Sequence, residues 1–183
     1  MKMTIWLVGL LVAVTLGGCR PDAATKPPPP REAVTGAFGF KLGERLDEKF
    51  EVTTNADGAM IWYGGALGEG QRPFRWVDVE VADDRRIYSI TAKTERTVDD
   101  MRALRKTLVT RLAEKYGVFG ADRNEPIWKL TRGQESVSFG ERPRNIMLWS
   151  GEDSLTVSYT DWAIAAEVEK QREAERQRVA KGL

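Results

Sequence analysis

Hydrophobic and polar residues alternate from Phe74 to Ala82, and this is the clearest strand pattern in the chain. Successive side chains of a strand point to opposite faces, so three valines fall on one side and Trp76, Asp78 and Glu80 on the other. A turn of acidic and basic residues follows, and residues 87–92 return as a partner strand. The pattern predicts a hairpin with one buried face.

Beyond residue 97 the hydrophobic residues recur every three or four positions, which is the spacing of one helix face. The members of this stripe are Val98, Met101, Leu104, Leu108, Leu112 and Tyr116. Thr97 is a suitable N-cap, and Gly117 is a suitable C-terminal cap because glycine adopts the left-handed conformation without strain. We therefore expect one long amphipathic helix of about five turns.

Four short segments after Pro126 predict an antiparallel meander, because turn residues separate them. The segments are 127–131, 135–139, 146–150 and 155–160. With the hairpin and the long helix they indicate an α+β fold in which an antiparallel sheet packs against that helix. The order of helices and strands hints at two similar halves, but no residue-level repeat supports a duplication.

Two shorter patterns lie N-terminal to the hairpin. Leu46 and Phe50 are four residues apart, which predicts a short helix over 43–50 with both on one face. Segment 64–70 contains four glycines in seven residues. It predicts a flexible connection rather than a phosphate-binding loop, because the Gly-Lys-Ser/Thr signature is missing.

The C-terminal segment 162–183 begins with apolar residues and then becomes highly charged. Trp162, Ala165 and Val168 form a short apolar side, and residues 169–181 are then nearly all charged. Opposite charges three residues apart stabilise a helix by about 0.2–0.5 kcal/mol per pair. We expect a charged helix that projects into solvent, since no sustained a/d heptad predicts a coiled coil.

The N-terminus combines one positive charge, Lys2, with an apolar run from Ile5 to Leu16. As a helix this run would be about 18 Å long, well short of the roughly 30 Å hydrocarbon core of a bilayer. A charged start followed by a short apolar stretch is typical of a secretory signal peptide.

The motif Leu16-Gly17-Gly18-Cys19 ends this run, and Cys19 is the only cysteine of the chain. It resembles the lipobox of bacterial lipoproteins. The resemblance implies that lipid, including palmitate, is attached to Cys19 and that residues 1–18 are removed. In similar Gram-negative lipoproteins an acidic residue after the cysteine favours the inner membrane, so Arg20 implies an outer-membrane anchor facing the periplasm. The alternative is an ordinary signal peptide or an N-terminal membrane helix, with Cys19 an incidental thiol.

Four consecutive prolines, Pro27 to Pro30, follow the anchor. Proline fixes φ and removes a backbone donor, so this stretch favours extended polyproline II. We expect a lipidated tether over 19–35, a globular domain over 36–161 and the charged helix over 162–183. The alternative for the prolines is a docking ligand for an aromatic-lined groove.

The amino-acid composition excludes several kinds of site and mechanism. The 183 residues include 28 Lys and Arg against 27 Asp and Glu, one cysteine and no histidine. An internal disulfide, a Cys/His zinc site and every histidine-dependent mechanism are excluded. The net charge of +1 gives no whole-chain electrostatic basis for nucleic-acid binding. We expect no cofactor and no metal ion.

Trp76 shares its predicted strand face with Asp78 and Glu80. An exposed indole beside carboxylates is a candidate site for a protein or a cationic ligand. The alternative is that the final helix covers this face and buries the indole. Asp83 and Asp84 add two further carboxylates to the hairpin, and oxygen ligands suit Ca²⁺, but the twelve-residue calcium-loop pattern is absent.

These patterns favour a non-catalytic binding or scaffold domain that faces the periplasm, is held on the membrane by lipid, and has another envelope protein as its partner. Two alternatives stay open. One is an inhibitor or immunity-type lipoprotein that neutralises an envelope-acting enzyme. The other is a cell-wall hydrolase that depends on a pair of carboxylates.

Overall fold

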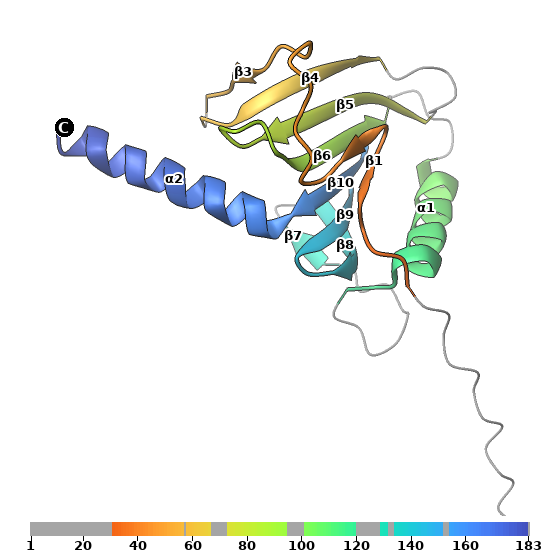
Figure 1. Cartoon of the computed structure of the whole chain (residues 1–183). Helices are drawn as coiled ribbons and strands as arrows, with labels where there is room; N and C mark the ends of the chain where they lie inside the picture. The colour runs from red at the N-terminus through yellow and green to blue at the C-terminus, as the bar shows by residue number, and fades with distance from the viewer. Residues whose placement is uncertain are drawn as a thin grey trace, which may run out of the picture. The chain divides into compact units, whose positions relative to one another are not determined.

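A computed structural model of the chain describes residues 31–56, 58–66, 73–94, 101–119, 129–131, 134–151 and 154–182 (Figure 1). All of them belong to one unit, which spans Arg31–Leu183. The predicted signal peptide, Cys19 and the proline run lie outside the described residues, and so does Thr97. Of the connection predicted over 64–70, residues 64–66 form the end of a strand instead, and the rest lies outside the described residues.

The described residues form two helices and two antiparallel sheets. The strands are β1 (Gly36–Ala37), β2 (Phe40–Lys41), β3 (Thr53–Thr54), β4 (Met60–Ala66), β5 (Phe74–Val81), β6 (Ile87–Thr94), β7 (Lys129–Thr131), β8 (Gln134–Glu141), β9 (Arg144–Ser150) and β10 (Leu155–Asp161), and the helices are α1 (Met101–Tyr116) and α2 (Trp162–Ala180). β1 pairs with β2, and the other eight strands form the main sheet. This architecture confirms the predicted α+β class.

The strand order β3-β4-β5-β6-β10-β9-β8-β7 divides the main sheet into two topologically similar halves. Strands β3–β6 form a meander that is followed by α1, and β7–β10 form a second meander that is followed by α2. The halves join where β6 pairs with β10, and Thr91 lies opposite Ser158 in the middle of that pair. Each half is therefore four strands and then a helix, rather than a helix and then strands.

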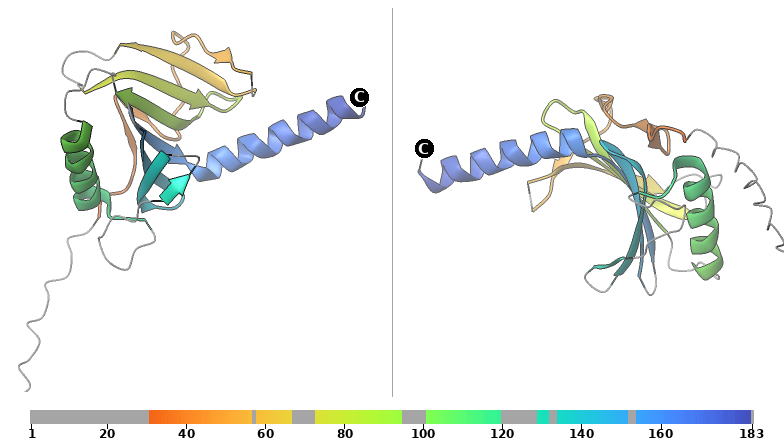
Figure 2. Two further views of the ribbon diagram at one scale, coloured as in Figure 1. Left: turned by 180° about the vertical axis from the view of Figure 1, so that it is seen from behind. Right: turned by 90° about the horizontal axis from the view of Figure 1, so that it is seen from below.

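One face of the main sheet forms the hydrophobic core. Val77, Val79 and Val81 are at most 1% exposed, as their alternation predicts. Phe139 of β8 and Ile146 of β9, in the other half of the sheet, are fully buried in the same cluster. Complete burial of an aliphatic or aromatic side chain contributes roughly 1.5–3 kcal/mol. The core face is covered by α1 and by the segment around β1 and β2 (Figure 2).

Helix α1 packs on the core through Leu112 and Tyr116, and Leu104 and Leu108 are partly buried against it. It ends as predicted, because Gly117 has a φ of 73° and its amide donates to the Ala113 carbonyl. The single long helix is not confirmed. The described helix has 16 residues, whereas α2 has 19.

The predicted helix over 43–50 is wrong. Leu46 is buried, but the backbone there forms turns. The guanidinium of Arg85 donates to the carbonyls of Leu46, Asp47 and Phe50 at 2.9–3.1 Å. Because these carbonyls are satisfied from the β5–β6 turn, the segment follows that turn instead of forming its own ladder of hydrogen bonds.

The boundary between tether and domain also needs correction, because residues 31–35 pack on the domain rather than belonging to the spacer. Val34 is only 4% exposed and belongs to the core. The amide of Glu32 donates to the Lys115 carbonyl at 2.9 Å. The sequence conceals this contact because Val34 is the only large apolar residue of segment 31–36 and no pattern marks it as buried.

Helix α2 follows β10 without a loop. Asp161 caps it by accepting from the amides of Ala163 and Ile164. Only the first half of the helix has buried residues, Ile164 and Val168. The second half projects beyond the sheet, as the sequence predicts (Figure 1). Figure 2 shows α1 and α2 on different sides of the sheet.

Candidate binding surface

Strand register places two rows of side chains on the face of the main sheet opposite the core, which we call the outer face. Residues directly opposite each other in an antiparallel pair share a face. The Trp76 row consists of Trp76, Lys93, Thr156 and Trp149, and the Asp78 row consists of Tyr63, Asp78, Thr91, Ser158 and Met147. Adjacent strands lie about 4.8 Å apart, so three strand spacings separate Trp76 from Trp149 by roughly 14 Å.

Two aromatic side chains of the outer face are exposed. Tyr63 is 57% exposed and Trp76 is 47% exposed. Tyr63 lies directly opposite Asp78, two residues from Trp76, so the two aromatic side chains are diagonal neighbours. The guanidinium of Arg75 lies 5.4 Å from the centre of the Trp76 ring, within cation–π distance. Exposed tyrosine and tryptophan side chains of this kind dominate binding energy at many protein interfaces.

Asp78 adds a carboxylate beside these rings. Its side chain is 24% exposed, and its Oδ2 lies 3.8 Å from Nζ of Lys93. Burial raises the pKa of Asp78 above its usual value, and the charge of Lys93 acts in the opposite direction. The ionised carboxylate is thus held where its charge costs folding stability, and such groups are concentrated at functional sites.

The centre of the outer face consists of small hydroxyl side chains. Oγ1 of Thr91 donates to Oγ of Ser158 at 3.0 Å, which links the two halves of the sheet. Thr156 and Thr160 continue the hydroxyl pattern along β10. The middle of the Asp78 row is therefore made of uncharged hydroxyl side chains, while Lys93 adds one positive charge to the neighbouring row.

Helix α2 reaches the outer face at the end where Glu80 lies. Ile164 and Val168 bury against Tyr88 in a small second cluster. The Arg172 guanidinium donates to the Tyr88 hydroxyl at 3.2 Å. Burial and the negative charge of Glu80 raise the pKa of Tyr88 to about 12. Trp76 keeps 47% of its surface exposed, so the helix borders the outer face without covering the indole.

The other carboxylates of the hairpin have separate roles. Asp84 lies in the turn after β5, and its Oδ2 is 2.6 Å from Nε of Arg86. Arg86 in turn lies 2.9 Å from Glu167 and so connects the turn to α2. Backbone and side-chain hydrogen bonds from Arg86 lower the pKa of Asp84. Among the described residues, no group of three or more metal-ligating side chains is close enough together to hold a metal ion.

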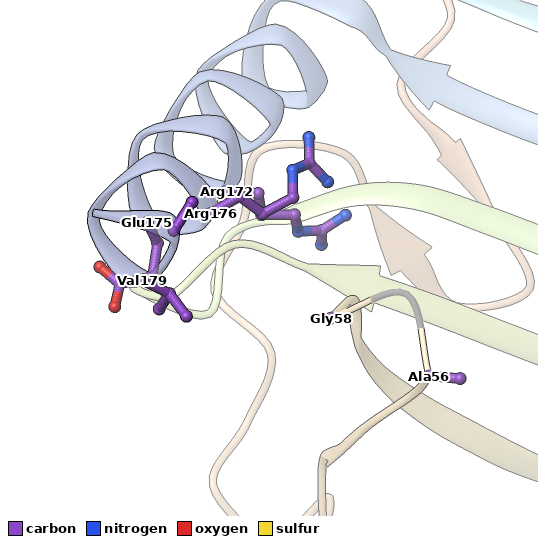
Figure 3. A pocket seen from close by; sticks show the side chains of 7 residues that line it. Ala56, Gly58, Arg172, Glu175, Arg176 and Val179 are labelled. Carbon is purple, nitrogen blue, oxygen red and sulfur yellow. The ribbon is translucent and has the colours of Figure 1, made fainter. Parts of the chain in front are cut away.

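A groove of about 680 Å³ separates the second half of α2 from the turn between β3 and β4 (Figure 3). Ala56 and Gly58 line it from the turn, and Arg172 and Arg176 line it from the helix. Arg176 is paired with Glu169 at 2.6 Å and Glu173 at 3.0 Å. Because these carboxylates already neutralise Arg176, the groove is a weak candidate for an anion.

The alternating pattern of β5 predicted three members of the outer face, but others have no signal in the sequence. Trp76, Asp78 and Glu80 do lie on one strand face, in β5. Tyr63 and Lys93 were missed, because their neighbours along the chain do not reveal them. Only the pairing of β4 and β6 with β5 brings them beside Trp76. Cys19, the predicted lipid-attachment residue, lies outside the described residues.

Comparisons with protein-family models, with curated proteins and with solved structures found no match for this chain. Among the described residues, neither helix combines the length and apolar character needed to cross a membrane.

Proposed function

We propose that this chain is a lipid-anchored lipoprotein of the bacterial outer membrane, and that its outer face binds another envelope protein in the periplasm without catalysing a reaction. The observation that carries the binding role is the exposure of Tyr63 and Trp76 beside Asp78. Large aromatic side chains lose little conformational entropy on binding and bury much area.

The charged side chains beside the aromatic pair indicate which polar groups a protein partner would present. Asp78 and Lys93 form a long ion pair of 3.8 Å at the edge of the aromatic pair. A partner can supply a donor to Asp78 or an acceptor to Lys93 with little reorganisation of the sheet. We expect an aromatic or aliphatic contact at the centre of the interface and polar contacts around it.

The proposal of a non-catalytic role rests on the available chemistry. The chain has no histidine and, after Cys19, no thiol. Asp78, the carboxylate of the outer face with a raised pKa, is engaged by Lys93. The lipid anchor is supported by the lipobox-like motif that ends at Cys19, and the outer-membrane location by Arg20.

Site-specific photo-crosslinking in intact cells tests the binding surface. A photoreactive residue at position 63 or 76 should give one defined adduct with an envelope protein, and Asp78→Asn should weaken it. The matched control position is Glu48, which is exposed in the loop between β2 and β3. The same adduct from position 48, or none from 63 and 76, would contradict the proposal.

The anchor is tested separately. Cys19→Ala should abolish palmitate labelling, block removal of residues 1–18 and release the protein from sedimented membranes, because acyl chains supply durable anchoring. Cys19→Ser is the conservative companion and should behave in the same way. Normal lipid labelling in either variant would refute attachment at Cys19.

A further inference from the structure

Helix α1 is the most unevenly charged element of the described chain. It contains Arg102, Arg105, Lys106, Arg111 and Lys115 against a single acidic residue, Glu114. Helix α2 carries basic and acidic residues in equal numbers and pairs many of them within the helix. The basic residues of α1 therefore form a local positive surface on a chain with a net charge of only +1.

The solvent side of α1 has a simple arrangement. Ala103, Thr107 and Thr110 form a small, exposed ridge along the helix. Arg102 and Lys106 lie on one side of this ridge, and Arg111 lies on the other, by the 100° rotation between successive helical residues. Together these six residues are called the basic face of α1. The low ridge lets the helix approach a flat surface while the longer basic side chains reach to both sides. The exposed Glu114 continues the ridge in the last turn and is the single acidic residue on this side of the helix.

Three charges of the basic face have no acidic partner among the described residues. Within the part of the chain that the structure describes, Arg105 is paired with Glu135 and Lys115 with Glu32 at 3.2 Å. No salt bridge of that part involves Arg102, Lys106 or Arg111, and all three are exposed. Their charge is available to an external anion.

The chain enters the domain beside this helix. The Glu32 amide donates to the Lys115 carbonyl at the end of α1, and Arg31 lies against Gly117. Eleven residues, Arg20 to Pro30, separate Arg31 from Cys19. Even fully extended, they span at most about 40 Å. A lipid at Cys19 would therefore keep α1 close to the membrane and at a high effective concentration there.

From this placement we infer that the basic face of α1 docks on the anionic phospholipid surface of the membrane that anchors the protein. The geometry rests on the proposed anchor at Cys19, but the charge complementarity does not. Docking of α1, which lies on a different side of the sheet from α2 (Figure 2), leaves α2 free to extend away from the membrane. It also makes the membrane, rather than the tether alone, set the orientation of the outer face.

Vesicle binding by the unlipidated chain from Arg20 onward tests this inference, because this chain keeps the whole unit Arg31–Leu183 but lacks the anchor. It should bind vesicles of 30% phosphatidylglycerol in phosphatidylcholine at low salt, and should not bind pure phosphatidylcholine. A basic residue near an anionic surface contributes roughly a fivefold factor in partitioning. The triple variant Arg102→Gln, Lys106→Gln, Arg111→Gln should therefore bind roughly 100-fold more weakly.

The matched control removes three basic charges from the other end of the molecule, as Lys170→Gln, Arg178→Gln, Lys181→Gln. It should keep most of the binding. Equal loss in both triple variants would show a net-charge effect and overturn the role of α1. Absence of binding by the unaltered chain at low salt would also overturn it.

A second measurement does not depend on charge substitutions. The chain from Arg20 onward has no cysteine, so Thr107→Cys or Gln171→Cys gives a single labelling site on α1 or α2. A fluorophore at position 107 should be quenched by brominated lipids, and one at position 171 should not; the reverse pattern would overturn the inference. Loss of vesicle binding with intact palmitate labelling at Cys19 rejects only the docking of α1, whereas failed labelling with intact vesicle binding rejects only the anchor.

Discussion

Arg144 and Asp161 join the end of the sheet to the start of α2. Nε of Arg144 lies 2.7 Å from Oδ2 of Asp161, whose side chain is only 6% exposed. The other carboxylate oxygen of Asp161 accepts from the amides of Ala163 and Ile164 at the helix start. One buried side chain thus satisfies the first free amides of α2 and holds a guanidinium from β9.

Removing this carboxylate should destabilise the domain. Asp161→Ala removes both the cap and the ion pair, so the free energy of unfolding should fall by about 2–3 kcal/mol. Asp161→Asn keeps an acceptor for the cap and should cost about 1 kcal/mol. Urea unfolding followed by circular dichroism measures both values. As a control, Glu175→Ala breaks an exposed 3.4 Å pair with Arg178 and should change stability by less than about 0.5 kcal/mol.

Two glycines with similar positive φ angles should respond differently to a methyl group. Gly39 has a φ of 85° and open space around it, so Gly39→Ala should cost only the left-handed strain of about 1–2 kcal/mol. Gly140 has a φ of 81°, and a Cβ there would lie 2.7 Å from Cγ2 of Val34. Val34 is buried and β-branched, so it cannot move away easily. Gly140→Ala should therefore cost about 1–2 kcal/mol more than Gly39→Ala.

A double-mutant cycle locates the origin of this difference. Val34→Ala removes the methyl group that the new Cβ would meet, so it should cost less in a Gly140→Ala background than in the unaltered chain. Additive effects in urea unfolding would mean that Val34 does not pack against Gly140. That result would indicate that residues 31–35 belong to the tether and not to the packed domain.

Alkaline pH should weaken the fold through two tyrosines. Burial raises the pKa of Tyr88 and of Tyr159 from 10.0 to about 12. Between about pH 10 and pH 12 the unfolded chain loses these phenolic protons while the folded chain keeps them, so stability falls as pH rises. Each group contributes at most about 2–3 kcal/mol to this loss.

Tyrosinate absorbance and urea unfolding between pH 9 and pH 12 measure this effect. Tyr159→Phe should lose less stability than the unaltered chain between pH 9 and pH 12, because one of the two titrating phenols is gone. Tyr88→Phe should show the same shallower pH dependence, with a small cost at neutral pH because Arg172 loses its 3.2 Å partner. An unchanged pH dependence in both variants would contradict the assignment.

Asp78→Asn should separate binding from stability. Burial raises the pKa of Asp78, so its charge costs stability once the pH exceeds that pKa, and the cost disappears as the carboxylate protonates at lower pH. At pH 7 the variant should be within about 0.5 kcal/mol of the unaltered chain or slightly more stable, because the long 3.8 Å pair with Lys93 only offsets the cost of burying the charge. A stability loss above about 1 kcal/mol would give Asp78 a structural role instead.

Local sequence patterns were sufficient for some elements of this fold. The alternation of valines with Trp76, Asp78 and Glu80 predicted β5 and its two faces, because side-chain direction in a strand follows from backbone geometry alone. Gly117 predicted the end of α1 for a similarly local reason. The charged composition after Val168 predicted a helix that leaves the sheet, since few of its side chains could be buried.

Contacts between distant segments of the chain determined the features that the local patterns did not predict. The guanidinium of Arg85 donates hydrogen bonds to the carbonyls of Leu46 and Phe50. The segment therefore forms turns instead of the predicted helix. Val34 is buried in a core to which distant segments of the chain contribute most of the residues. The registers of β4 and β6 against β5 bring Tyr63 and Lys93 beside Trp76.

The sequence by itself therefore determined the two faces of β5, the end of α1 at Gly117 and the charged character of α2. The tertiary structure alone decided which faces meet and which stay exposed, because strand order and register depend on contacts between residues that are distant along the chain. The outer face and the basic face of α1 are products of those contacts.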